Sequence, residues 1–250
     1  MSSIDNWETA SFFALVLGFE LWERYSPARK VDKFVDLKLD LLSFALAVLM
    51  AHLSRHLVDK LIGSVSPDFV LTSLATLRSW PGGAKIAMAV VMVDFTIYWI
   101  HRAQHRFDFM WRTHKWHHSV SEMYWFSGFR TSFVHSLIYN IPQTVIPMHF
   151  FHLSPLEAGI GYSIALFIQF WEHTNVQVNI GWLKHIFITP QYHRVHHSAT
   201  VRGWNFGTTF SLWDRMFGTY VNPDLLAENY PLGLGETVRP KEVPRMLLGL

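Results

Sequence analysis

The side chains most able to do chemistry in this chain are histidines, of which there are fifteen, whereas cysteine is absent. The lack of cysteine excludes disulfides, thiolate zinc sites, iron–sulfur clusters and cysteine nucleophiles. Imidazole, by contrast, is a good ligand for zinc, copper, iron and nickel. The histidines that matter form three short clusters and one isolated partner: His101, His105, His114, His117, His118, His173, His193, His196 and His197.

The spacing within the clusters is typical of metal ligands on helices. His101 and His105 stand at positions i and i+4, which places both imidazoles on one helix face, one turn apart. The second cluster reads H-x-x-H-H from His114, and the same pattern recurs from His193. Its first histidine can pair with either of the other two, while the adjacent pair diverges. Such a pattern can serve two metals at once.

The histidines outside the clusters need separate interpretation. His173 directly follows an apolar run, so it could approach the clusters as a ninth ligand, although a lone histidine is more often a packed or interfacial residue. We interpret it as a ligand. Six others are predicted to be structural, with His135 the least secure of them: His52, His56, His135, His149, His152 and His185.

The donor set indicates which metal to expect. Neutral imidazole nitrogens with no obvious carboxylate suit two borderline-soft divalent ions. Iron joins imidazole ligation to dioxygen activation, and zinc would bind nearly as well, so the identity of the metal follows from the expected chemistry rather than from affinity.

The elements that must position these histidines are apolar runs. Half of the residues are apolar, and 16% are charged. Soluble domains have roughly 25% charged residues, so the lower share here favours a membrane protein. The runs approach the roughly 20 residues that a membrane span needs. They are Ser11–Trp22, Leu39–Leu53, Ala84–Ile100, Phe133–Phe151 and Leu156–Trp171. A soluble all-helical protein with buried helices is the alternative, and five such runs argue against it.

Basic residues give the expected orientation. Residues 23–38 and the stretch after Ile100 are both rich in lysine and arginine, so both are expected to be cytoplasmic. The order of the spans then brings all three clusters and His173 to the cytoplasmic side. The sequence therefore predicts an all-α, multi-spanning membrane protein with a histidine-rich helical cap on that side, and the N-terminus does not look like a cleaved signal peptide.

The chain is expected to form a single domain over residues 1–250, with its core motifs at about 84–220, because it shows no internal repeat or Pro/Gly-rich linker. The aromatic segment WNFGTTFSLWDRMFGTY is expected to lie at the membrane interface and could cap the site. The net charge of +2 is too small to indicate nucleic-acid binding.

Five motifs in order resemble the fatty acid hydroxylase and sterol desaturase superfamily of membrane di-iron oxygenases. They are DFTIYWIHRAQH, WRTHKWHH, EHTN, TPQYHRVHH and WDRMFGT. QFWEHTN and LWDRMFGT look closest to alkylglycerol monooxygenases and bacterial sterol-desaturase-like proteins. The resemblance implies two iron ions, dioxygen as co-substrate, a separate reductase or cytochrome-type electron donor, and hydroxylation or desaturation of a lipid chain, ether lipid or sterol.

Two positions depart from related patterns. Gln177 stands where some fatty acid hydroxylases carry a further histidine, which leaves a site of nine histidines. Asn175 stands where the ether-lipid enzymes are expected to have glutamate, which weakens the case for ether-lipid cleavage.

Polar residues near the clusters are candidates for orienting the ligands, because metal-bound imidazoles usually donate their other N–H to a carboxylate or carbonyl. Asp94 stands out, since it lies about two turns before His101 on the same helix face, where an unpaired carboxylate would be costly. Pairing of Asp94 with Arg130 is the structural alternative. Asn175 is a second candidate, and Glu172 and Asn205 are lesser ones.

Two other functional classes remain open at this point. A histidine-rich membrane metal transporter or metal-binding protein would want ionisable ligands near the midplane of several spans, where this chain has almost none. A metal-stabilised scaffold would need closed, fully coordinated sites.

Overall fold

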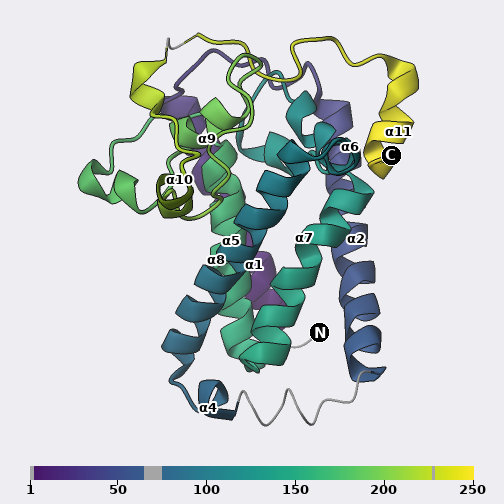
Figure 1. Cartoon of the computed structure of the whole chain (residues 1–250), viewed down its shortest axis with the longest axis vertical. Coiled ribbons are helices and arrows are strands. Elements are labelled where there is room, and N and C mark those ends of the chain that lie inside the picture. The colour runs from purple at the N-terminus through teal and green to yellow at the C-terminus, as the bar shows by residue number, and fades with distance from the viewer. Residues whose placement is uncertain (1–2, 65–74, 227–228) are drawn as a thin grey trace.

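A computed structural model of the chain describes residues 3–64, 75–226 and 229–250 (Figure 1). In these ranges the regular structure is helical, and β-pairing is limited to three isolated bridges, for example between Pro27 and Val176. The prediction of an all-α fold is therefore confirmed.

Four of the predicted apolar runs each lie within one long helix, and the run Phe133–Phe151 covers a helix, the π-helix that follows it and the C-cap Phe151 of that π-helix. The helices concerned are α1 (Ser3–Tyr25), α2 (Leu37–Ser64), α5 (Gly82–Arg106), α7 (Phe133–Thr144) with the π-helix η3 (Val145–Phe150), and α8 (Pro155–His173). The long helices run side by side along the long axis of the molecule, and the short helix α4 (Ala75–Arg78) lies at their lower end in Figure 1.

Local sequence explains where α8 begins and where α7 changes into the π-helix η3. Ser154 caps α8 by accepting a hydrogen bond from the backbone N–H of Glu157, whose carboxylate accepts one from the Ser154 N–H in return. Pro155 occupies the first turn, where its missing N–H is not needed. Pro142 lies inside α7, and the helix widens into the π-helix shortly after it, as expected where proline removes an intrahelical hydrogen bond.

The long helices pack in pairs, α1 against α8 and α2 against α7. Phe19 of α1 and Phe170 of α8 form part of one aromatic core cluster, which Trp125 joins from the short helix η2 (Trp125–Phe129). A second cluster lies toward the opposite end, where Ile86 of α5 packs near Phe151. Ile164 of α8 also packs against this second cluster, so α5 and α8 are held together, and both helices carry candidate ligands at their C-terminal ends.

The outer faces of the long helices are apolar. Large hydrophobic side chains are exposed on α1, α2, α5 and α8, among them Phe13, Leu17, Leu41, Leu49, Phe95 and Phe167. Within the described ranges, Leu37–Val58 and Gly82–Arg106 are long and apolar enough to cross a membrane. Two candidate spans are thus supported by length and composition.

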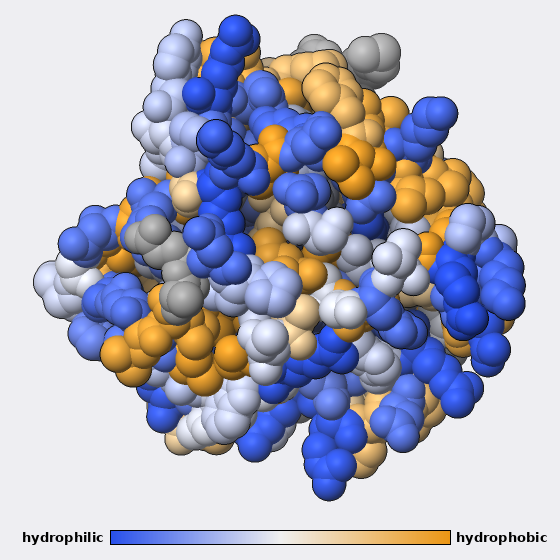
Figure 2. Space-filling model, turned by 90° about the horizontal axis from the view of Figure 1, so that it is seen from above, coloured by the Kyte–Doolittle hydropathy of each residue, from blue (hydrophilic) through white to orange (hydrophobic). Residues whose placement is uncertain are grey.

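Short helices cover the upper end of the bundle in Figure 1. They are α6 (Asp108–Lys115), η1 (His117–Ser119), η4 (Gly181–His185), α9 (Pro190–His196), α10 (Leu212–Phe217), η5 (Pro223–Leu225), η6 (Pro240–Glu242) and α11 (Val243–Leu248). Seen from above, this cap is mainly hydrophilic with apolar residues toward its edge (Figure 2). The predicted aromatic segment lies in the cap and contains α10.

Candidate metal centre

All nine predicted ligands meet at the junction of the bundle and the cap. They come from the C-terminal ends of α5 and α8, from α6 with the following turn η1, and from α9 with its C-cap. They form two groups, in each of which the potential ligand atoms all lie within 4.8 Å of one another. The convergence predicted from the sequence is therefore present in the fold.

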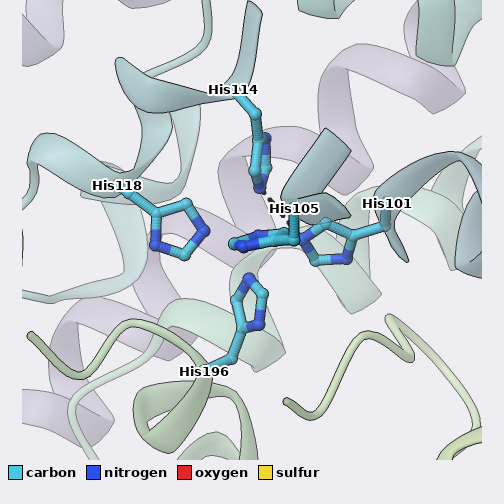
Figure 3. A group of neighbouring side chains, drawn as sticks. All are labelled: His101, His105, His114, His118 and His196. Carbon is cyan, nitrogen blue, oxygen red and sulfur yellow. Dashed lines mark hydrogen bonds between the residues drawn. The ribbon is translucent and has the colours of Figure 1, made fainter. Parts of the chain in front are cut away.

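The first group contains five histidines: His101, His105, His114, His118 and His196. Figure 3 shows their imidazoles turned toward one another around a common point. The Nε2 atoms of His101 and His114 are 2.9 Å apart. Three other Nε2 atoms, those of His105, His118 and His196, are buried with no hydrogen-bond partner. Buried unpaired nitrogens are rare in proteins, so this cluster has the donor set of a cation site.

The second group contains four histidines: His117, His173, His193 and His197. Their Nε2 atoms converge, with 3.2 Å between His173 and His117, 3.1 Å between His197 and His117, and 3.2 Å between His193 and His173. This group includes His173, as the sequence predicted, and it does not include His135.

Backbone carbonyls fix which nitrogen several of these rings offer. The Nδ1 of His117 lies 3.2 Å from the carbonyl oxygen of Arg130, and that of His173 lies 3.1 Å from the carbonyl of Gln169. A carbonyl only accepts, so each Nδ1 must donate and each Nε2 keeps a lone pair. Two lone pairs then face each other at 3.2 Å. That arrangement is unfavourable alone and favourable around a cation, so the residues fit a divalent metal.

The same arrangement holds in the first group. His101 Nδ1 donates to the carbonyl of Phe206 and His196 Nδ1 to that of Trp204, both at 2.8 Å. Asn205 lies between these two carbonyls with a left-handed φ of 59°, which asparagine tolerates better than most residues. Its side chain bonds to the backbone of Tyr192 and Val221 and holds this turn in place.

Each H-x-x-H-H motif is divided between the two groups. His114 and His118, at positions i and i+4, enter the first group, and the intervening His117 enters the second. In the later motif the division is reversed: His193 and His197 enter the second group, and His196 enters the first. The divergence of adjacent histidines predicted from helical geometry is the reason for this division.

Burial keeps the cap histidines neutral. Removal from water, reinforced by neighbouring histidines, lowers the pKa of His114, His117 and His118 well below its ordinary value. Burial also lowers the pKa of His196 to about 4. At neutral pH these rings therefore carry no proton on the ligating nitrogen, as metal binding requires.

Asp94 makes neither of the contacts considered for it. Its carboxylate accepts hydrogen bonds from Thr208 Oγ1 at 2.7 Å, from the backbone of Thr209 and Phe210 at 2.7 and 3.2 Å, and from Trp213 Nε1 at 2.8 Å. The alternative pairing with Arg130 is wrong, because that guanidinium pairs with Asp36 and Asp40. Asp94 thus anchors the segment whose Phe206 carbonyl orients His101.

The remaining polar candidates play different parts. Glu172 lies 3.5 Å from His173 Nδ1 and 3.8 Å from His193 Nδ1, so it is the carboxylate nearest to the ligands of the second group. Asn175 is further removed: its side chain bonds to the backbone N–H and carbonyl of Arg29, and its own N–H donates to Glu23. Asn175 therefore ties the end of α8 to the loop after α1.

His135 lies against the first group without joining it. Its Nδ1 is 3.0 Å from His114 Nδ1 and 3.2 Å from Gln104 Nε2.

Gln104 and the backbone carbonyls of Phe206, Trp204, Arg130 and Gln169 were not predicted from the sequence. The carbonyls could not have been, because every residue carries one. The other five histidines predicted to be structural lie outside both groups, and among them His52 and His56 pair edge to face on α2, with ring centroids 4.8 Å apart.

Comparison with known proteins identifies this histidine arrangement. The family described as fatty acid hydroxylase matches residues 86–219, which is more than half of the chain. The chain belongs to the fatty acid hydroxylase family. The predicted resemblance to this superfamily is confirmed, and the match spans every histidine of both groups.

The relatives that the chain matches include proteins named as lipid-modifying enzymes. The chain is 27% identical to ornithine lipid hydroxylase OlsE of Rhizobium tropici over 87% of this chain and 68% of that protein. It is 34% identical to the alkylglycerol monooxygenase of Homo sapiens over 53% of this chain and 29% of the relative. It is 27% identical to a probable Delta(7)-sterol 5(6)-desaturase of Neurospora crassa over 58% of this chain and 40% of the relative.

The chain spans less than a third of the length of the alkylglycerol monooxygenase that it matches. No solved structure matches the chain significantly. Hydroxylases, monooxygenases and desaturases among the relatives support an oxidoreductase, with histidine groups that fit metal binding.

Proposed function

We propose that this protein is a membrane enzyme that binds two iron ions in its two histidine groups and oxidises a C–H bond of a lipid with dioxygen. The observation that carries the proposal is the division of nine neutral imidazoles into a five-membered and a four-membered group that share both H-x-x-H-H motifs. When bound, the iron ions would supply the activation of dioxygen that no side chain can perform.

The residues of the chain then serve to hold, orient and shield that centre. Eight of the nine ligands would come from the three clusters, with His173 as the ninth. The carbonyls of Phe206, Trp204 and Arg130 fix ring orientation. Six of the nine rings come from the short helices of the cap, and burial of the rings keeps bulk water away from the ligating nitrogens.

The membrane arrangement is part of the proposal. Five long helices with exposed apolar faces would span or enter the bilayer, and the hydrophilic cap would face the cytoplasm with the lysine- and arginine-rich stretches after α1 and α5. A lipid acyl chain, ether lipid or sterol would reach the centre from the bilayer. A separate reductase or cytochrome-type protein would supply electrons, because the chain carries no haem or flavin motif.

A metal transporter is less well supported. Transport would place ionisable ligands near the midplane of several spans. Here all nine candidate ligands lie at one end of the bundle, where the long helices meet the cap.

The test combines metal analysis with turnover. We expect the purified protein to contain about two iron ions per chain and to consume dioxygen only with a reductant and a membrane lipid extract. Mass spectrometry of lipids from a host with and without the gene should show the gain of one oxygen or the loss of two hydrogens. Metal binding without lipid-dependent oxygen consumption would contradict the enzyme assignment.

A further inference from the structure

Two cavities outside the histidine centre share a wall. One is an apolar groove of about 880 Å³ between α5 and α8, and the other is a polar cavity of about 280 Å³ in the cap. Ile180 and Phe187, which flank η4, line both of them. The two cavities are therefore adjacent.

The groove has the chemistry of a hydrocarbon site. Its walls are aliphatic and aromatic side chains such as Val90 of α5 and Ile164 and Phe167 of α8. Its one carboxylate, Glu157, lies at the far end and pairs with Lys85 at 3.0 Å. Its volume lies within the range of roughly 300–1,000 Å³ that ligand pockets occupy.

The polar cavity offers both signs of charge. Lys184 and Asp224 line it and form an ion pair at 2.9 Å, with 41% and 59% of their side chains exposed. Amide groups of Asn179, Gln191 and Asn222 add donors and acceptors around the pair. An exposed ion pair of this kind contributes little to the stability of the fold. A ligand that carries both charges could therefore replace the contact between Lys184 and Asp224 with little loss of free energy.

The shared wall lies where a polar–apolar boundary would be expected. Trp182 of η4 is 69% exposed and stands beside Lys184 and His185, while Leu183 is an apolar wall of the groove. Tryptophan next to basic residues is typical of the membrane–water interface. A lipid that crosses this boundary would have its headgroup on the side of the polar cavity and its acyl chain on the side of the apolar groove.

We propose that the two cavities together bind one zwitterionic membrane lipid, with the headgroup at Lys184 and Asp224 and an acyl chain in the groove between α5 and α8. Charge complementarity favours a zwitterion, because Asp224 would repel a purely anionic headgroup and an uncharged one would leave the pair without new partners. The site is separate from the histidine centre, and the proposal does not require the protein to be an enzyme.

The groove also touches the segment held by Asp94. Thr208, Thr209 and Phe210 line it, and all three donate hydrogen bonds to the Asp94 carboxylate. A chain in the groove would therefore lie against the same segment that presents the Phe206 carbonyl to His101.

Native mass spectrometry of the full chain in detergent tests the proposal with three lipids that share the same acyl chains: dioleoylphosphatidylethanolamine, dioleoylphosphatidylglycerol and dioleoylglycerol. We expect one site that prefers the zwitterionic ethanolamine lipid. Lys184→Gln and Asp224→Asn should each weaken its binding by about threefold to fivefold, the scale of one exposed ionic contact. Asp224→Asn should in addition raise the relative binding of phosphatidylglycerol, because the repelling charge is gone.

Two further variants complete the experiment. Gly83 lines the groove, and a Cβ atom added there would meet no atom within 4 Å. Gly83→Leu should therefore extend a side chain into the groove and weaken the binding of all three lipids. Lys241→Gln, a change at an exposed lysine in η6, should leave binding unchanged. Equal binding of the three lipids, a preference for phosphatidylglycerol in the unmodified chain, or indifference to both charge variants would each overturn the proposal.

Discussion

The reactivity of the proposed centre depends on which ring nitrogen each histidine presents. In His101, His117, His173 and His196 the Nδ1 donates to a backbone carbonyl, which leaves the Nε2 lone pair for a metal. The sequence predicted eight of the nine converging histidines from helical spacing, and the ninth, His173, from its place directly after an apolar run. It could not predict how they divide, because His114 can pair with a neighbour at i+3 or at i+4, and only the fold selects between them.

The two histidines whose roles the spacing left open give a direct prediction. His173→Ala should abolish turnover and reduce the bound iron, because it deletes one of four candidate ligands from the second group. His135→Ala should keep near-normal iron, because it leaves all nine candidate ligands in place. Iron stoichiometry of the two purified variants checks this, and loss of iron from His135→Ala alone would reverse the assignment.

Protonation gives a second prediction at this scale. A histidine titrates near 6.5 in the unfolded chain, while burial lowers the pKa of His196 in the folded protein to about 4. As the pH falls from 6.5 toward 4, the unfolded state binds a proton that the folded state does not, so the metal-free protein should lose stability. Above pH 6.5 this contribution is fully present.

Thermal unfolding midpoints of the metal-free protein in detergent, measured between pH 8 and about pH 4, test the sign. His185→Ala, a change at an exposed histidine, should show the same decline and serves as the control. A midpoint that is constant or rises on acidification would contradict the prediction.

Among the elements, α5 connects the bundle to the cap through one carboxylate. The sequence predicted the long helices well, because apolar runs report directly on them, and it marked Asp94 as unusual. It could not predict the partners of Asp94, because Thr208 lies 114 residues away in a segment without periodicity. The alternative pairing with Arg130 could not be excluded from the sequence for the same reason, since Asp36 and Asp40 meet Arg130 only through the tertiary packing.

Asp94→Asn tests this connection. The amide keeps one acceptor oxygen but turns an NH₂ group toward backbone N–H donors, so the unfolding free energy should fall by about 2–3 kcal/mol. Metal affinity of the first group should fall roughly tenfold or more, because the Phe206 carbonyl that orients His101 loses its anchor. Metal titration followed by thermal unfolding measures both effects.

Asp108→Asn, a matched change at an exposed carboxylate at the start of α6, provides the control and should alter neither quantity appreciably. If both variants bind metal like the unmodified chain, Asp94 does not position the ligands of the first group.

Considered as a whole, the molecule has an apolar bundle and a hydrophilic cap. The two histidine groups lie where the long helices meet the cap. The low share of charged residues predicted a membrane protein. The exposed Phe, Leu and Trp side chains on the long helices agree with that prediction, because their exposure to water is costly. The number of spans does not follow from the fold alone: α2 and α5 are long and apolar enough to cross a bilayer, and the others enter it only by the proposed arrangement.

Accessibility labelling tests that arrangement. Tags inserted after Lys30 and after Lys115 should both be cytoplasmic, because both stretches are rich in lysine and arginine. A tag at the C-terminus, which lies in the cap in Figure 1, should label from the same side. Labelling of the first two positions from opposite sides would refute the five-span topology.

The division of each H-x-x-H-H motif between both groups has a consequence for the order in which two metal ions would bind. In the proposed centre, an ion in one group would order the backbone of η1 and α9, and the same backbone carries candidate ligands of the other group. The conformational entropy of ordering these turns is lost only once, so the first ion should make the second bind more tightly. At substoichiometric metal the population should separate into empty and doubly filled molecules, with singly filled ones rare.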